Sequence, residues 1–212
     1  MNPTSRHRLG VLAVVAFTGP IAAAALLACS STDPTASHPQ TSAAVATAPT
    51  GLRWQSFQGM DLPVTDQGPQ NADGAAVGGF ERSPAGAALA AVHASVRMSI
   101  APDGTWAAVG QQMLAPGPGR DAWATARAQI SITAPITDGA PKLLGYRVTR
   151  YSPEASDIEV YSHHPDNSAT RHDTHVLWQR EDWRLHLPEN PTTSSVTAVT
   201  SPPTDMVAFT PR

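Results

Sequence analysis

Two kinds of residue in this chain could do chemistry: one cysteine and a group of histidines. Cys29 is the only cysteine in 212 residues, and it directly follows Leu26-Leu27-Ala28 at the end of an apolar run. A thiol at that place is where lipoprotein processing attaches a diacylglyceryl group. We therefore predict that Cys29 is lipidated, which leaves no thiol for a disulfide or for a cysteine metal site. The alternative is an incidental cysteine in a plain signal peptide.

The segment before Cys29 has the features of an export signal. Arg6 and Arg8 give it a basic start, and residues 9–28 are apolar apart from Thr18. Gly19-Pro20 interrupts a helix there, which favours a cleaved signal. The apolar run is also long enough to cross a bilayer, so an uncleaved anchor stays open. Either way, the prediction is a chain held on the extracytoplasmic face of the cell membrane.

The histidines do not form a convincing metal site. Five of them lie in the C-terminal half: His163, His164, His172, His175 and His186. His172 and His175 have H-x-x-H spacing, but on a strand these two side chains point to opposite faces. We therefore predict no metal and no cofactor. His93, four residues after Leu89 on the apolar side of a helix, is interpreted as a hydrogen-bonded core histidine rather than the base of a pocket.

The sequence contains no pattern that selects catalytic residues. Asp121, Tyr146 and His175 could reach a cavity and act there as acid or base, yet no spacing rule singles them out. Serine nucleophile motifs are absent, and Gly78-Gly79 is not followed by the lysine of a phosphate loop. We therefore predict no enzymatic activity. The tryptophans follow the apolar faces of the expected elements, which favours core positions over a binding surface: Trp54, Trp106, Trp123, Trp178 and Trp183.

Composition divides the chain into four parts. A signal peptide (1–28) is followed by a Ser/Thr/Ala/Pro linker (29–50), one domain (51–190) and a flexible tail (191–212). A relaxed linker of this length would span about 25 Å. The tail ends in the apolar island 206–209, which is expected to dock back on the domain. The chain has 14 basic and 17 acidic residues, so without Arg6 and Arg8 its formal charge is −5, which argues against nucleic-acid binding.

Three helices are expected in the first half of the domain. Ser83-Pro84 supplies a cap and an N1 proline, and the helix that follows should end at Pro102. Asp103 is expected to cap a second helix. A third, with Asp121 in its first turn, should run to the residue before Pro135.

Four strands are expected after the helices, because the apolar period changes to two. They lie around residues 144–148, 158–160, 176–178 and 183–187, with Glu181-Asp182 as the turn between the last two. Short loops imply an antiparallel meander, covered on one face by the helices. Residues 52–64 are interpreted as an extended lead-in. The predicted class is therefore α+β.

Two parts of the chain resemble known families. Helices before strands, with a final W-x-L-x-L-P hairpin (183–188), resemble the NTF2-like fold, a curved sheet wrapped around helices. The pattern W-x-x-F-x-G-x-x-L-P (54–63), Gly68-Pro69, Gly78-Gly79-Phe80 and Pro118-Gly119-Arg120-Asp121 is similar to an uncharacterised family of actinobacterial lipoproteins. That resemblance implies a setting beside conjugative-transfer genes of integrative elements, and no catalytic residues.

The function predicted from the sequence is binding or assembly. We expect a lipid-anchored scaffold with an envelope protein partner, as an accessory of conjugative transfer machinery. The alternatives are an NTF2-like pocket protein that binds or converts a small ligand, and a lipoprotein that binds another envelope ligand. The first predicts a filled cone with an exposed apolar patch, and the second predicts a deep cavity with inward polar groups.

Overall fold

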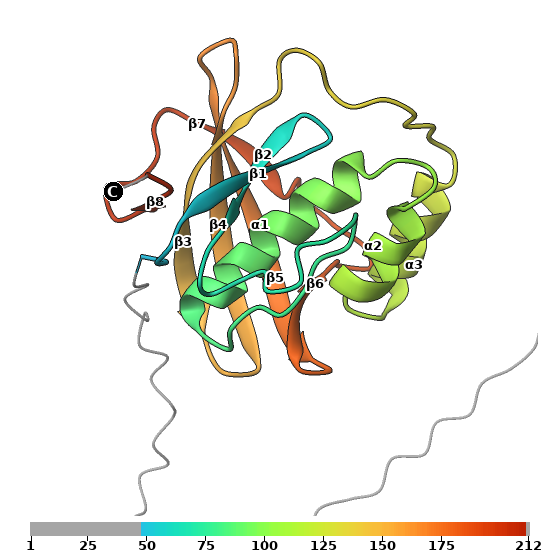
Figure 1. Ribbon diagram of the computed structural model, residues 1–212, viewed down its shortest axis with the longest axis horizontal. Coiled ribbons are helices and arrows are strands. Elements are labelled where there is room, and N and C mark those ends of the chain that lie inside the picture. The colour runs from blue at the N-terminus through green and yellow to red at the C-terminus, as the bar shows by residue number, and fades with distance from the viewer. Residues whose placement is uncertain (1–47, 211–212) are drawn as a thin grey trace, which may run out of the picture. The chain divides into compact units, whose positions relative to one another are not determined.

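The computed structural model describes residues 48–210 as an α+β fold with three helices and antiparallel β-structure (Figure 1). The predictions for Cys29, for the signal peptide and for most of the linker lie outside these residues. Among the described helices, none has both the length and the apolar character needed to cross a membrane.

The three helices are α1 (Pro84–Ile100), α2 (Trp106–Met113) and α3 (Pro118–Arg127). The Ser83 hydroxyl accepts a hydrogen bond from the Gly86 amide at 3.2 Å, which confirms the predicted cap of α1. Most of α1 up to Ala94 is alanine and is buried, because small side chains let the sheet and the loops approach the helix closely.

Two helix boundaries differ from the prediction. The N-cap residue of α2 is Thr105, because the Asp103 carboxylate is used elsewhere, by Arg127 and by Ser131. The third helix ends at Arg127 rather than near Pro135, so Ile130 lies beyond it and is 56% exposed. The Arg127 side chain explains this end, since it donates to the carbonyl oxygens of Ile130 and Ala101 and holds the chain in a turn.

The predicted meander consists of β3 (Lys142–Tyr151), β4 (Ala155–His163), β5 (Ala169–Gln179) and β6 (Asp182–His186). Each strand is antiparallel to the next. Their inward residues form the core with α1, which lies across the sheet while α2 and α3 lie near β6 (Figure 1). The helices therefore cover one face, as predicted.

The sheet has six strands rather than the predicted four, because the tail adds two. Strand β7 (Val196–Val199) pairs with β5, and β8 (Val207–Ala208) pairs with β3. The next residue, Phe209, is buried against the ring of Tyr146, with centroids 5.5 Å apart. The docking predicted for the apolar island is thus present, and it extends the sheet.

Residues 53–64 form a second small sheet instead of a plain extended lead-in. Strand β1 (Arg53–Phe57) and strand β2 (Met60–Val64) make a hairpin whose turn, Gln58-Gly59, has positive φ at both positions. The turn between β5 and β6 is of the same kind but lies at Arg180-Glu181, one residue earlier than predicted. Both turns match the two-residue loops that suit twisted strands.

Candidate functional site

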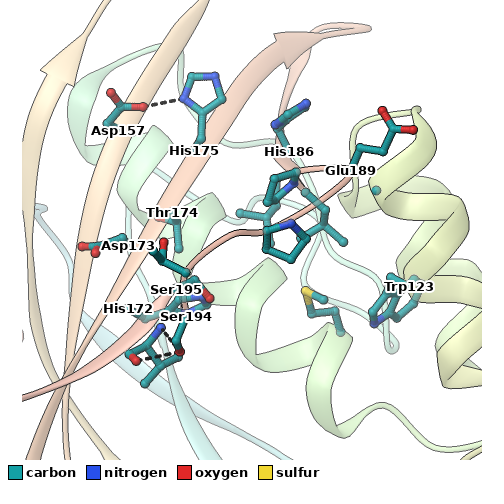
Figure 2. A pocket seen from close by; sticks show the side chains of 18 of the residues that line it. Trp123, Asp157, His172, Asp173, Thr174, His175, His186, Glu189, Ser194 and Ser195 are labelled. Carbon is teal, nitrogen blue, oxygen red and sulfur yellow. Dashed lines mark hydrogen bonds and ion pairs between the residues drawn. The ribbon is translucent and has the colours of Figure 1, made fainter.

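A groove of about 970 Å³ lies beside β5 and β6 in the described residues 48–210 (Figure 2). The C-terminal end of α1 and one side of α3 form one wall, and strands β4 to β6 form the other. The segment 187–196, which connects β6 to β7, borders it. We call this hollow the β5 groove.

The helical wall of the β5 groove is apolar. Met98 from α1 and Trp123 from α3 line it together with Ala122 and Ala126. Trp123 is held edge-on against Trp106 with centroids 5.8 Å apart, and it packs so close to Gly110 that a Cβ there would lie 2.5 Å from the ring. Glycine at position 110 is therefore needed to set the tryptophan in this wall.

A row of polar side chains on β4, β5 and β6 borders the groove from the face of the sheet that points away from α1, and Arg150 of β3 extends this row beyond the groove. Asp157, His175 and His186 form this row, and the four residues occupy paired positions on neighbouring strands. Arg150 Nε lies 2.8 Å from one oxygen of Asp157, and His175 Nδ1 lies 2.5 Å from the other. The rings of His175 and His186 are 5.6 Å apart. Figure 2 shows these three side chains on one side of the view and Trp123 on the other.

Asp157 sets the hydrogen-bonding state of His175. A carboxylate only accepts hydrogen bonds, so in the neutral ring the proton lies on Nδ1 and Nε2 is left as an acceptor. Arg150 pairs with the second oxygen of Asp157. This wall therefore offers acceptors to a ligand.

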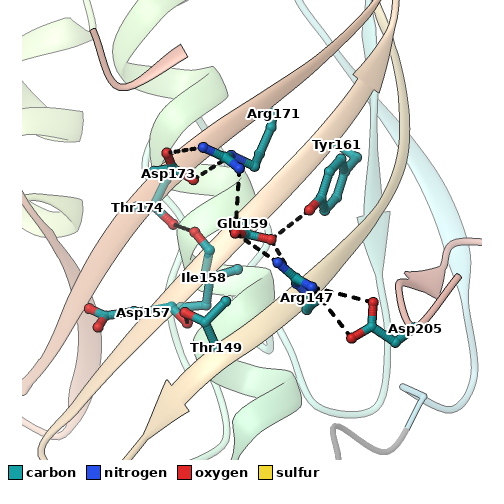
Figure 3. Close-up of polar contacts among 10 residues, drawn as sticks. All are labelled: Arg147, Thr149, Asp157, Ile158, Glu159, Tyr161, Arg171, Asp173, Thr174 and Asp205. Carbon is teal, nitrogen blue, oxygen red and sulfur yellow. Dashed lines mark hydrogen bonds and ion pairs between the residues drawn. The ribbon is translucent and has the colours of Figure 1, made fainter. Parts of the chain in front are cut away.

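A second polar network extends over the same face of the sheet (Figure 3). Glu159 accepts hydrogen bonds from Arg147 Nε at 2.7 Å and from the Tyr161 hydroxyl at 2.5 Å, and Arg147 also pairs with Asp205 of the tail. Arg171 bridges Glu159 and Asp173. The network ties the tail to β3 and β4.

The pKa values in this network follow from its contacts. Burial, together with the hydrogen bond to Glu159, raises the pKa of Tyr161 to about 12. For Glu159, burial alone would raise the pKa, but hydrogen bonds from Arg147 and Tyr161 outweigh it and lower the pKa below its usual value. Both groups thus stay in one protonation state at neutral pH, which suits a structural role better than proton transfer.

His172 and His175 both line the β5 groove, although they lie on opposite faces of β5. Burial lowers the pKa of His172. Within the described residues, no group of three or more His, Cys, Asp or Glu side chains is arranged to hold a metal ion.

The other residues considered from the sequence lie elsewhere. His93 is fully buried: its Nε2 contacts the carbonyl oxygen of Pro63 at 2.8 Å, and its Nδ1 accepts from Arg97 Nε at 3.3 Å. It is a core histidine, as predicted. Tyr146 is also buried, which raises its pKa, and Asp121 is exposed at the start of α3 beside Arg120. Neither lines the β5 groove.

Arg97 is a buried cation that no sequence pattern singled out. Its guanidinium donates to the carbonyl oxygens of Gly74 and Ala75 and lies 4.2 Å from the ring centroid of Phe57. Burial lowers its pKa to about 10. It holds the loop 70–79 on α1. The signal available in the sequence was its spacing, four residues after His93 on the same helical face.

Gly79 and Phe80 also bind a carboxylate. Their amides donate to the Asp182 side chain at 2.8 and 3.1 Å, and the Trp183 amide donates to it at 2.9 Å. Successive backbone N–H groups make a small anion site of this kind. Because Asp182 occupies it, the glycines serve to join this loop to the start of β6.

Comparison with known proteins gives a family and no activity. The chain belongs to the family described as Domain of unknown function (DUF8175), which matches residues 18–205. No curated protein matches it. No solved structure matches it either.

Proposed function

We propose that this chain is a lipid-anchored, extracytoplasmic binding protein that uses the β5 groove to hold a partner. The carrying observation is the groove itself, an open hollow lined by apolar side chains from α1 and α3 and by polar side chains from β4, β5 and β6. Sites of this size with mixed lining are typical of ligand binding. The anchor and the location rest on Cys29 and on the segment before it.

The contacts of the titratable groups support binding rather than catalysis. His93, Arg97 and Arg127 are buried and satisfy carbonyl oxygens of the chain. Glu159 is bound by two arginines and a tyrosine. These groups hold loops and strands in place. An NTF2-like shape and an accessory role in conjugative transfer belong to the same proposal, and they rest on the sequence resemblances.

The proposal is tested by filling the groove in cells. Ala126→Trp places a large ring on an exposed helical position that lines the groove, and Ala107→Trp does the same on α2, outside it. In a strain lacking the gene, we expect the Ala126 variant to fail to restore the transfer frequency of the element and the Ala107 variant to restore it. Equal restoration by both folded variants would contradict the proposal.

A second function is favoured by the Asp157–His175 pair on the groove wall. An imidazole oriented by a carboxylate can act as a general base, so the groove could convert a small ligand. The two functions differ in their response to point mutants. As a scaffold, the chain should tolerate His93→Gln, Asp121→Asn, Tyr146→Phe, His172→Gln and His175→Gln. As an enzyme, it should lose its function with His175→Gln while remaining folded.

A further inference from the structure

The side of the β5 groove that faces α1 indicates which molecule it holds, and this inference rests on the function proposed above. The alternation of β5 places His172 and Thr174 on that side, because their partners on β4, Val160 and Ile158, belong to the core. Leu185 of β6 is a core residue as well. We call the following lining residues the inner part of the groove: Met98, Trp123, Ala126, His172, Thr174 and Leu185.

The inner part of the groove carries no formal charge at neutral pH. His172 is its only ionisable residue, and burial between Val160 of β4 and Val196 of β7 lowers its pKa, so the ring is neutral. The carboxylates of β4 and β5 lie on the other face of the sheet and are paired with arginines. A charged ligand group would lose hydration here without gaining an opposite charge. The ligand should therefore be uncharged.

His172 offers the inner part of the groove one free polar group. Its ring has no hydrogen-bond partner within residues 48–210. A neutral imidazole has one donor nitrogen and one acceptor nitrogen. A partly buried polar group without a partner costs free energy, so a ligand that supplies a partner is favoured at this position. A hydroxyl or amide group both donates and accepts, and it therefore fits this ring.

The hydroxyl groups of the groove distinguish a hydrocarbon ligand from a peptide. Those of Ser99, Thr174 and Ser194 each donate to a backbone carbonyl oxygen of this chain at 2.8 Å. Their protons are therefore already used. An extended peptide carries a donor and an acceptor at nearly every residue and needs as many partners when it is buried. A hydrocarbon chain needs a partner at its polar end only, so it suits this lining better.

The free polar group and the aromatic ring lie at different ends of the groove. In Figure 2, His172 lies beside Ser194 and Ser195 on one side of the view, and Trp123 lies on the other. Aromatic and thioether side chains such as Trp123 and Met98 pack well against aliphatic chains. We infer that the inner part of the groove binds an uncharged long-chain molecule, whose hydroxyl or amide group contacts His172 and whose hydrocarbon chain lies along Met98 and Trp123.

The test is photolabelling of the full chain held in nanodiscs of zwitterionic lipid. Three probes carry a diazirine in the same hydrocarbon chain and differ only in the polar end: hexadecanol, hexadecylamine and hexadecyl sulfate. Mapping of the labelled peptides by mass spectrometry separates label in the groove from label on segments in the bilayer. We expect hexadecanol to label the groove at least tenfold more than either charged probe, and an excess of unlabelled hexadecanol to remove this label.

Variants test the assigned contacts. His172→Phe keeps a ring without donor or acceptor, so groove labelling by hexadecanol should fall about fivefold, as the loss of one hydrogen bond predicts. His172→Gln keeps both a donor and an acceptor and should retain the label. A ring needed only for packing would give the opposite order. Ala126→Trp should reduce the label at least tenfold, and Ala107→Trp, outside the groove, should leave it unchanged.

Other outcomes separate this inference from the proposed function. Equal groove labelling by a charged probe, or full labelling of the His172→Phe variant, would overturn the inference. An uncharged leucine–serine peptide with a photoreactive leucine serves as a fourth probe. If it labelled the groove in place of hexadecanol and Ala126→Trp blocked it, the groove would hold a protein segment, and the inference would be overturned alone. If no probe gave groove labelling sensitive to Ala126→Trp, the inference would also fail, and the transfer assay with that variant then decides the proposed function.

Discussion

At the scale of single residues, the described chain stabilises its loops with buried cationic or ionisable side chains that contact carbonyl oxygens. Arg127 fixes the end of α3, and Arg97 with His93 fixes the loop 70–79 and strand β2 against α1. A buried polar group costs free energy unless it is hydrogen-bonded. These side chains join segments that are distant in sequence. Removal of one of them should therefore destabilise every segment that it contacts.

His93 makes the stability of the domain depend on pH. Burial, the main cause, and the nearby Arg97 charge lower its pKa from 6.5 to about 3, despite its hydrogen bond to Pro63. Between these values the unfolded chain binds a proton that the folded chain does not, so stability falls as pH falls. The loss is about 1.4 kcal/mol per pH unit, or about 2 kcal/mol from pH 7 to pH 5.

Urea unfolding at pH 7 and pH 5 checks this prediction. His93→Gln removes the titrating ring, so the variant should lose about 2 kcal/mol less than the wild type over that interval. His163→Gln, a change at a less buried histidine of β4, is the matched control and should keep the wild-type dependence. An unchanged pH dependence in the His93 variant would show that another group is responsible.

The sequence was sufficient to predict His93 as a core residue, because helical spacing put it beside Leu89. The sequence was not sufficient to predict which residues line the β5 groove. Asp157 and His175 meet only because β4 and β5 pair in one particular register, and the alternation of a strand gives its faces but not its register. Predicting that pair needs the turn positions, and one of the expected turns was displaced by a residue.

At the scale of elements, the two tail strands are the main difference between the predicted sheet and the observed one. Strand β7 carries exposed residues, and β8 has two residues only, so their hydrophobic patterns are too short to detect. What fixes β8 is the side chain after it: Phe209 packs between Trp54 of β1 and Tyr146 of β3. Without Phe209, only the backbone pairing of β8 and the ion pair between Arg147 and Asp205 would hold this end of the tail on β3.

Phe209→Ala tests this role of the tail. Removing a buried phenylalanine ring leaves a cavity and costs about 3 kcal/mol or more. We therefore expect a lower free energy of unfolding in urea, together with faster amide exchange at Tyr146 and Val207, where β3 and β8 pair. Val196→Ala, on the exposed strand β7, is the control and should change stability by less than about 0.5 kcal/mol.

If the Phe209 variant kept the stability of the wild type, the contact with Tyr146 and Trp54 would not be what holds the tail. Loss of stability without faster exchange at Val207 would place the effect in the core alone. The two measurements therefore separate docking of the tail from general packing.

At the scale of the whole molecule, the order of helices before the four-stranded meander was enough to predict an α+β fold. Long periodic segments identify the type of each element even where its ends are misplaced by a few residues. The four-part division of the chain rests on composition, and the sheet uses residues that the division assigned to the tail. The β5 groove, which we propose as the binding site, has no comparable pattern in the sequence, since it is made by residues from several separate segments.

The proposed place of the molecule in the cell rests on Cys29. We predict that Cys29→Ala either releases the chain from the membrane fraction or blocks its processing, because without the thiol no diacylglyceryl group can be attached. Cells labelled with a fatty-acid probe should show a labelled band for the wild type and none for the variant. Ser31→Ala, two residues later in the linker, is the matched control and should keep the label.

If the Cys29 variant retained both its label and its membrane fraction, the anchor would lie elsewhere. If it lost the label but stayed in the membrane at its full unprocessed mass, the apolar run before Cys29 would be able to act as the anchor itself, because it is long enough to cross a bilayer.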